Sequence, residues 1–136
     1  MPQAGQEIEG FGGMRLRLLT VEPEELVMEA TYSGEAGMPP AHLHPSQAEH
    51  FEVLEGRMRA IVDGQERVYE AGEAFDVPAG TPHQMGAEEP TRMRWEVRPA
   101  LRTAEFFERL YGDGPDSARE MGDSFVTEFD AEFRLA

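Results

Sequence analysis

Four side chains in this chain have the chemistry of a metal site. His42 and His44 are two residues apart, so on a β-strand both leave the same face. Glu49 follows shortly after them, and His83 lies further on, in the Pro/Gly-rich segment PAGTPHQM. Three neutral imidazoles and one carboxylate are typical ligands of first-row transition metals. The four residues therefore predict a site for one divalent metal ion.

The spacing of these residues requires a bend in the chain. Pro45 and the polar residues after it interrupt the strand, and a bend between two neighbouring strands would bring Glu49 back beside His42 and His44. Because Mg and Ca prefer oxygen ligands, the expected metal is Fe, Mn, Ni, Cu or Zn. Such an ion keeps open positions for water, substrate or dioxygen and acts as a Lewis acid. The alternative is that the histidines are ordinary polar residues without a metal.

The elements that would position these residues are short strands. Apolar and polar residues alternate in several segments, and Asp63-Gly64 is a strong signal for a tight hairpin. The alternating segments are 14–18, 26–32, 57–62 and 93–97. Strands separated by turns roughly every eight to twelve residues are typical of an all-β sandwich or barrel.

Two motifs in the chain resemble the paired motifs of the cupins. The first is His42-x-His44-x4-Glu49-x6-Gly56, and the second is Gly72-x5-Pro78-x-Gly80-x2-His83. The resemblance covers roughly Met38 to Val97. Two positions differ from the usual pattern, since Gly37 stands one residue closer to His42 than is usual and Ala87 replaces an asparagine.

This resemblance implies an all-β, single-domain cupin barrel, also described as a double-stranded β-helix or jelly roll. It also implies that His42, His44, Glu49 and His83 together bind the metal, and that the protein forms a homodimer. Glu49 is the candidate catalytic base, a role that it can take only if it leaves the metal.

The chain of 136 residues is predicted to form one domain in three parts. Residues 1–10 are expected to be a disordered or loosely docked lead, 11–99 the cupin barrel, and 100–136 a C-terminal helix and docking tail. The helix is predicted over 101–112, with Thr103 as N-cap and Gly112 as its end, packed on the outside of the barrel.

The tail carries Phe125, Phe129 and Phe133 at intervals of four residues. This spacing fits a helix, but the same segment could pair as an edge strand. Three aromatic side chains among so many acids are expected to dock, either on the chain's own barrel or on a second subunit.

A substrate cavity is predicted beside the metal. Phe51 and Val53 share the strand face of Glu49, whereas His50 has the opposite parity and should point outward. Other expected lining residues are Phe75, Met85, Trp95, and Tyr32 or Met28. These side chains either surround a mostly apolar or aromatic ligand or simply fill a small barrel.

Composition excludes several classes of function. The formal net charge of −15 disfavours nucleic acid and anionic membrane surfaces as partners. The chain has no cysteine and no lysine, which excludes thiolate and Schiff-base chemistry. No apolar run is long enough for a membrane span and the N-terminus does not look like a secretion signal, so we expect a cytoplasmic protein with a small-molecule partner.

Two functions fit these observations. The first is a metal-dependent enzyme acting on a small organic molecule, an oxidoreductase of the dioxygenase type or an isomerase or cyclase. The second is a non-catalytic, metal-containing module that binds or senses a small molecule. A metal-free structural cupin is a third reading.

Overall fold

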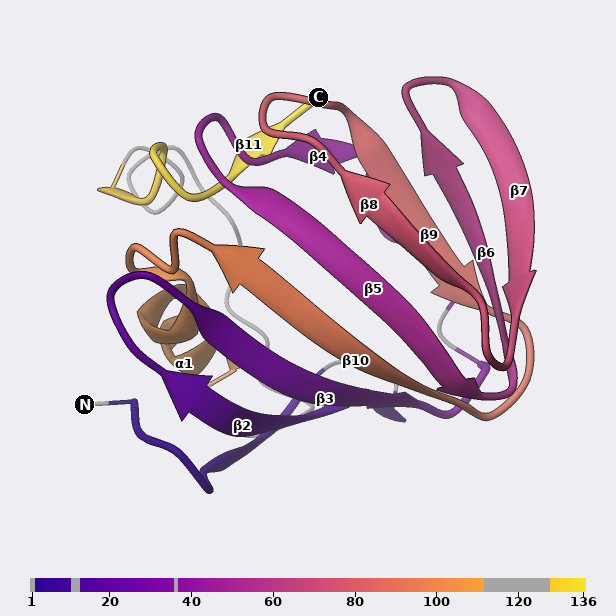
Figure 1. The fold of residues 1–136 in the computed structure, drawn as a ribbon, viewed down its shortest axis with the longest axis horizontal. Coiled ribbons are helices and arrows are strands. Elements are labelled where there is room, and N and C mark those ends of the chain that lie inside the picture. Colours follow the sequence, from indigo (N-terminus) through magenta and orange to yellow (C-terminus); the bar gives the residue numbers. More distant parts are fainter. Residues whose placement is uncertain (1, 11–12, 36, 112–127) are drawn as a thin grey trace.

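The computed structural model describes residues 2–10, 13–35, 37–111 and 128–136 of the chain. Within them, two antiparallel sheets pack against each other as a sandwich (Figure 1). The larger sheet has the strand order β1-β2-β3-β10-β5-β8, and the smaller has the order β11-β4-β9-β6-β7. The predicted all-β jelly-roll architecture is therefore confirmed.

The strands of the larger sheet are β1 (Glu7–Glu9), β2 (Arg15–Val21), β3 (Leu26–Tyr32), β5 (Ala48–Glu55), β8 (Ala74–Val77) and β10 (Thr91–Arg98). Those of the smaller sheet are β4 (His42–Leu43), β6 (Arg57–Val62), β7 (Gln65–Glu70), β9 (His83–Ala87) and β11 (Arg134–Leu135). The one helix of the described residues is α1 (Thr103–Tyr111).

Alternation in the sequence sets which face of each strand is buried. In β10, Met93, Trp95 and Val97 are buried, whereas Arg94 and Arg98 between and after them are exposed. Because successive side chains of a strand point to opposite faces, one face of the sheet becomes apolar and packs against the other sheet. The hairpin between β6 and β7 turns at Asp63 and Gly64, both with positive φ, as predicted.

The N-terminal lead differs from its prediction. Glu7–Glu9 form β1, which pairs with β2 and places Ile8 opposite Leu16, and Ile8 is buried. A three-residue strand with one apolar side chain among acids is too short to produce a recognisable alternation. Pairing with β2, and not local pattern, therefore orders this segment.

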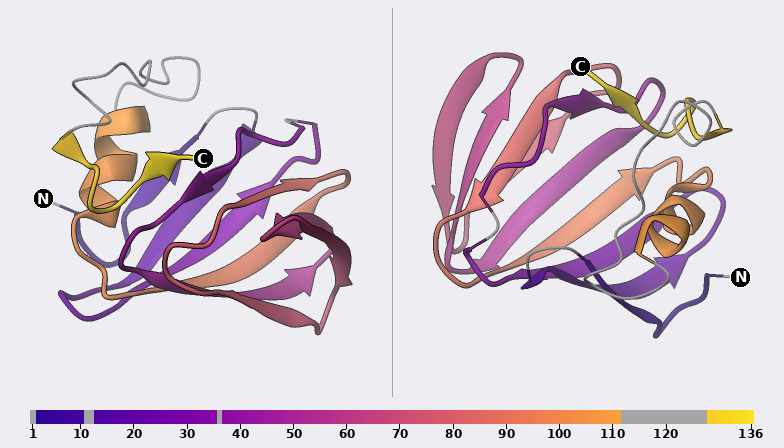
Figure 2. Two further views of the ribbon diagram at one scale, coloured as in Figure 1. Left: turned by 90° about the horizontal axis from the view of Figure 1, so that it is seen from above. Right: turned by 180° about the vertical axis from the view of Figure 1, so that it is seen from behind.

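The helix lies at one open end of the sandwich, between the edges of the two sheets (Figures 1 and 2). It was predicted to pack outside the barrel, but Thr103, Phe106 and Leu110 are buried against the interior at this end. Thr103 is the first helical residue and not the N-cap, since the Phe106 amide already donates to the Arg102 carbonyl oxygen. The predicted end at Gly112 lies outside the described residues.

The C-terminal segment docks on the chain's own sheet. After turns at residues 129–132, β11 pairs with β4, so this part forms an edge strand and not a helix. Phe129 is fully buried against Phe106 and Leu110 of α1. Phe125 lies outside the described residues.

No described helix is long and apolar enough to cross a membrane.

Two glycines with positive φ provide a test of how this fold is held. A Cβ at Gly56 would overlap the Pro90 carbonyl oxygen, whereas a Cβ at Gly72 would meet nothing within 4 Å. We expect Gly72→Ala to cost about 1–2 kcal/mol through backbone strain alone. Gly56→Ala adds a steric clash and should cost about 2–5 kcal/mol in urea unfolding. Equal losses for the two variants would show that the contact with Pro90 is unimportant.

Candidate metal centre

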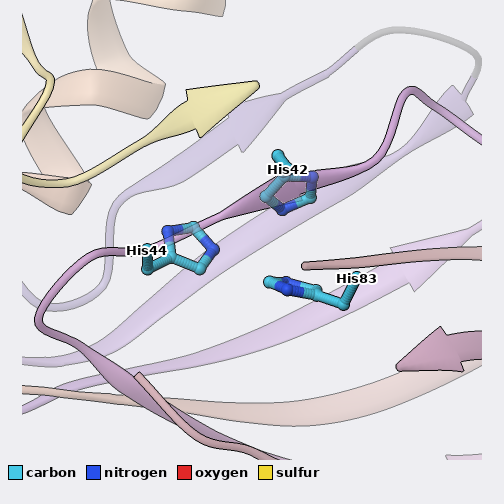
Figure 3. A group of neighbouring side chains, drawn as sticks. All are labelled: His42, His44 and His83. Carbon is cyan, nitrogen blue, oxygen red and sulfur yellow. The ribbon is translucent and has the colours of Figure 1, made fainter. Parts of the chain in front are cut away.

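The three predicted histidines meet inside the sandwich. His42 on β4 lies directly opposite His83 at the start of β9, and His44 follows the end of β4. One ring nitrogen from each lies within 4.8 Å of the others. Figure 3 shows the three rings turned toward a common region. Cross-strand pairing and the same-face rule together explain why residues 41 positions apart in the sequence come together.

Glu49 reaches the histidines from the opposite sheet. Its Oε1 lies 3.1 Å from His44 Nε2 and 3.0 Å from His83 Nε2, and the residue is almost completely buried. The prediction placed Glu49 on a strand next to the histidine strand. Instead β4 and β5 belong to different sheets, so the chain between them crosses the sandwich and Glu49 faces the histidines across its interior.

Each imidazole is oriented by a backbone carbonyl oxygen near its Nδ1. The pairs are His42 with Pro40 at 3.3 Å, His44 with Glu132 at 2.6 Å, and His83 with Thr81 at 2.9 Å. A carbonyl oxygen can only accept a hydrogen bond, so Nδ1 carries the proton in each ring. The lone pair then sits on Nε2, which is the arrangement of a metal-ligating histidine.

The buried atoms at the centre of the cluster lack hydrogen-bond partners. They are His44 Nε2, His83 Nε2 and Glu49 Oε1. The three atoms lie close together, yet none of these contacts has hydrogen-bond geometry. Lone pairs and a negative oxygen facing one another out of water are costly unless a cation lies between them. The residues therefore fit a bound metal cation, and their nitrogen and oxygen donors suit a first-row transition metal.

The other oxygen of Glu49 is held by Trp95. The indole Nε1 donates a hydrogen bond of 2.7 Å to Glu49 Oε2, and both side chains are buried. Trp95 lies on β10, the neighbour of β5 in the larger sheet. This contact directs Oε1 toward the histidines, a role that strand alternation could not reveal.

Burial and mutual contact shift the protonation of the cluster. Burial alone would raise the pKa of Glu49, but the imidazoles of His44 and His83 outweigh it and lower the pKa to about 2. Burial lowers the pKa of His42 to about 4, assisted by the charges of His83 and His44. Burial also disfavours the charged form of His44, but contact with Glu49 outweighs it, so the pKa of His44 is raised.

A cavity of about 380 Å³ opens from the histidine cluster toward α1. Of the predicted lining residues, Phe51, Met85, Trp95 and Tyr32 line it, in addition to His42, His44, Glu49 and His83. Val53 and Phe75, which were also expected to line a cavity, do not line this one.

Val53 and Phe75 lie deeper between the sheets. Val53 is two pleats further along β5 than Glu49, opposite Met93, and Phe75 stacks on Phe51 and Tyr69. Both side chains share the buried face of their strands. The alternation of residues in a strand predicts which face is buried, but it does not predict where along that face the packed core ends and the cavity begins. Met28, the alternative to Tyr32, is also a core residue and not a lining one.

Sequence reasoning missed three contributors to the site. Glu132 and Phe133 of the C-terminal segment line the cavity beside the histidines. Gln47, buried in the crossing between sheets, donates to the carbonyl oxygens of Pro99 and Ala100 and to Thr103 Oγ1. No local pattern marks these residues, although the three phenylalanines of the tail were a signal that it would dock. His50, as expected from its parity, lies at the surface, where it contacts Asp76.

The pKa of His42 predicts how stability depends on pH in protein stripped of metal. Because its pKa falls from 6.5 to about 4 on folding, the unfolded chain binds more protons between these values. The contribution of His42 to stability is therefore present above pH 6.5 and is lost as the pH falls toward 4. In chelator-treated protein, His42→Gln should lose less stability than the wild type over this range in urea unfolding. If the free energy of unfolding fell equally with pH in the two proteins, the lowered pKa of His42 would be contradicted.

Comparisons with known proteins agree with this architecture. The family model described as a cupin domain matches residues 28–97. No curated protein sequence is similar enough to this chain to count as a relative. Among solved structures, KdgF from Halomonas sp. is 20% identical with a TM-score of 0.62, and the match covers 67% of this chain and 83% of that one.

Two further structures have the same fold. An RmlC-like cupin from Shewanella frigidimarina is 23% identical, with a TM-score of 0.64 and coverage of 71% of this chain and 85% of that one. The cupin domain of Cnp3 from Schizosaccharomyces pombe is 18% identical, with a TM-score of 0.59 and coverage of 71% and 70%. Because these identities are low, the structures show the fold alone. The family model matches just over half of the chain, and the protein therefore belongs to the cupin domain family.

Proposed function

We propose that this cupin binds one divalent transition metal through His42, His44, His83 and Glu49 and acts on a small organic molecule in the adjoining cavity. The observation that carries the proposal is the convergence of three buried acceptor atoms, from two sheets, that have no hydrogen-bond partner. Fe, Mn, Ni, Cu and Zn all accept this donor set.

The chain's own groups prepare the site for chemistry. Backbone carbonyl oxygens hold the imidazoles, and Trp95 holds Glu49, so the ligand atoms are oriented before a metal arrives. The apolar cavity keeps water from the reacting region. When bound, the metal would supply Lewis acidity or a centre for dioxygen. An oxidoreductase of the dioxygenase type, or an isomerase or cyclase, is the proposed enzyme class.

Glu49 could serve as a base only after its contacts change. A carboxylate whose pKa is about 2 is a weak base, and this low pKa depends on its contacts with His44 and His83. A catalytic role for Glu49 thus requires that it move away from the histidines during the reaction.

A non-catalytic role in binding or sensing is the second candidate. Among the described cavity residues outside the cluster, the titratable groups are Tyr32, Tyr111 and Glu132. Burial raises the pKa of both tyrosines, which makes them poor acids near neutral pH. Few groups therefore remain to transfer protons, and this favours a module that holds a ligand.

The remaining expectations stay predictions. A homodimer is implied by the family, and light scattering on the purified protein would test it. The net charge of −15 supports a small-molecule partner over nucleic acid, and a cytoplasmic location is still expected.

Metal content tests the proposal directly. Protein purified without chelator should contain about one transition-metal ion per chain by elemental analysis. His44→Ala should weaken metal binding by at least about 10- to 100-fold, because loss of even an outer partner of a ligand has that effect. His50→Ala is the matched control, a surface histidine on β5 outside the cluster, and should keep the metal. A wild-type protein that takes up none of the five metals would overturn the proposal.

Turnover separates the two candidate functions. Dioxygen uptake and substrate conversion should be screened on the protein loaded in turn with each metal. Activity that follows one metal and disappears in His44→Ala supports the enzyme. A metal-loaded protein that binds small molecules without converting any of them supports the binding module.

A further inference from the structure

The cavity beside the histidines is mainly apolar and, outside the histidine cluster, has no cationic side chain among its described lining residues. Apart from the cluster itself, its walls are formed mainly by aromatic and aliphatic side chains, including Phe51, Phe107, Phe133, Met85 and Leu110. None of the described lining residues is an arginine, and the chain has no lysine. An anionic group away from the metal would find no positive partner there.

The few polar groups in the cavity also provide no positive charge for an anion. Burial raises the pKa of Tyr32 and Tyr111, so both hydroxyls stay protonated and neutral. Glu132, which also borders the cavity, is an acid, and its carboxylate is already paired with Arg102. A negative charge that a ligand placed here, away from the metal, would be desolvated without a cation among the described lining residues to compensate it.

We infer that the part of the molecule that lies in this cavity, away from the histidine end, is an uncharged aromatic or aliphatic ring, and not a charged sugar or a phosphate ester. The inference rests on the proposed function only in that a polar group of the compound meets the metal at the histidine end. A volume of about 380 Å³ suits a small ligand of one or two rings.

The single tryptophan of the chain gives a direct readout. Trp95 lines the cavity and donates to Glu49, so its indole N–H is a unique NMR signal within the site. We would titrate the zinc-loaded and metal-free proteins with 2-naphthol, with 2-naphthoate, a matched anion, and with galacturonate. In the metal-free protein, where no carboxylate can bind zinc, the naphthol should shift the signal and bind at least about tenfold more tightly than either anion.

The outcomes test the inferred ligand class and the proposed metal-dependent function separately. Anions that bind the metal-free protein as tightly as the naphthol, or a naphthol that does not move the Trp95 signal in either form, would overturn the inferred ligand class even if the protein binds a metal. Naphthol selectivity in a protein that takes up no metal would instead leave the ligand class standing and remove the proposed function.

The C-terminal segment, residues 128–136, contacts the histidines directly through Glu132 and Phe133. The Glu132 carbonyl oxygen accepts from His44 Nδ1 at 2.6 Å. The Phe133 ring stacks on His42 with centroids 4.9 Å apart, and on Phe106 at 5.0 Å. β11 then pairs with β4, the strand that carries His42. Two of the three histidines are thus positioned by a segment almost 90 residues away.

The segment is anchored on its other side by α1. Phe129 is fully buried, with the guanidinium groups of Arg102 and Arg109 over its ring at 4.6 and 5.4 Å. Arg102 also contacts the carboxylate of Glu132 at 3.5 Å. Docking of the segment therefore depends on contacts that do not involve the metal ligands.

The geometry points to a linked equilibrium in which docking of the C-terminal segment strengthens metal binding and metal binding holds the segment in place. Glu132, through its carbonyl oxygen, and Phe133 act as positioning residues for His44 and His42. Linkage requires the effect to be reciprocal, so each event must favour the other by the same factor.

Zinc affinity and amide hydrogen exchange test this linkage without any activity assay. In competition with a chromogenic chelator, Phe133→Ala and a chain ending at residue 131 should bind zinc about 10- to 100-fold more weakly than the full chain. Arg134→Ala is the control, because its exposed side chain contacts Asp130 and not the histidines. It should bind zinc like the wild type.

In the full chain, zinc should slow amide exchange in residues 128–136. Unchanged exchange there, or unchanged zinc affinity in Phe133→Ala, would overturn the linkage, as would a full chain that binds no zinc. If the shortened chain does not fold, Phe133→Ala and the exchange experiment still decide the question.

Discussion

The constraint on which the site depends is a buried carboxylate facing two imidazoles across the space between two sheets. Glu49 belongs to the larger sheet, His83 belongs to the smaller one, and His44 directly follows strand β4 of the smaller one. Their unpaired acceptor atoms are costly to bury together in an apolar interior, and a cation bound between them would remove that cost. The same cation would join the two layers of the sandwich, so the requirement of the site is also a contribution to the fold.

The surroundings of the cluster divide into an orienting side and an apolar side. Carbonyl oxygens hold the Nδ1 atoms of His44 and His83, and the Trp95 indole holds Oε2 of Glu49, which leaves their other side-chain polar atoms directed at one point. Beyond that point the walls are aromatic and aliphatic. Low polarity strengthens every electrostatic interaction at the centre and restricts which molecules can approach it.

The C-terminal segment contributes both to the orientation of the histidines and to the apolar wall of the cavity. The Glu132 carbonyl oxygen orients His44, and Phe133 lines part of the cavity and stacks on His42. Residues far apart in the chain therefore serve the site together, and the helix α1, which lies at the same end, supports them. The stability of this end and the properties of the site are consequently tied to each other.

The amino-acid sequence alone determined the alternating strand segments 14–18, 26–32, 57–62 and 93–97 with their buried faces, the hairpin at Asp63-Gly64 and the four candidate ligands. These features depend on alternation, turn chemistry and residue type, which are local properties. Even the approach of His83 to His42 follows from a known motif.

Tertiary structure decided the rest. Which sheet carries Glu49, where the core ends at Val53 and Phe75 and the cavity begins, and which carbonyl oxygen meets His44 all depend on packing between distant segments. The bond between His44 and Glu132 joins residues that no periodicity relates, because a backbone carbonyl acts as an acceptor whatever side chain it carries.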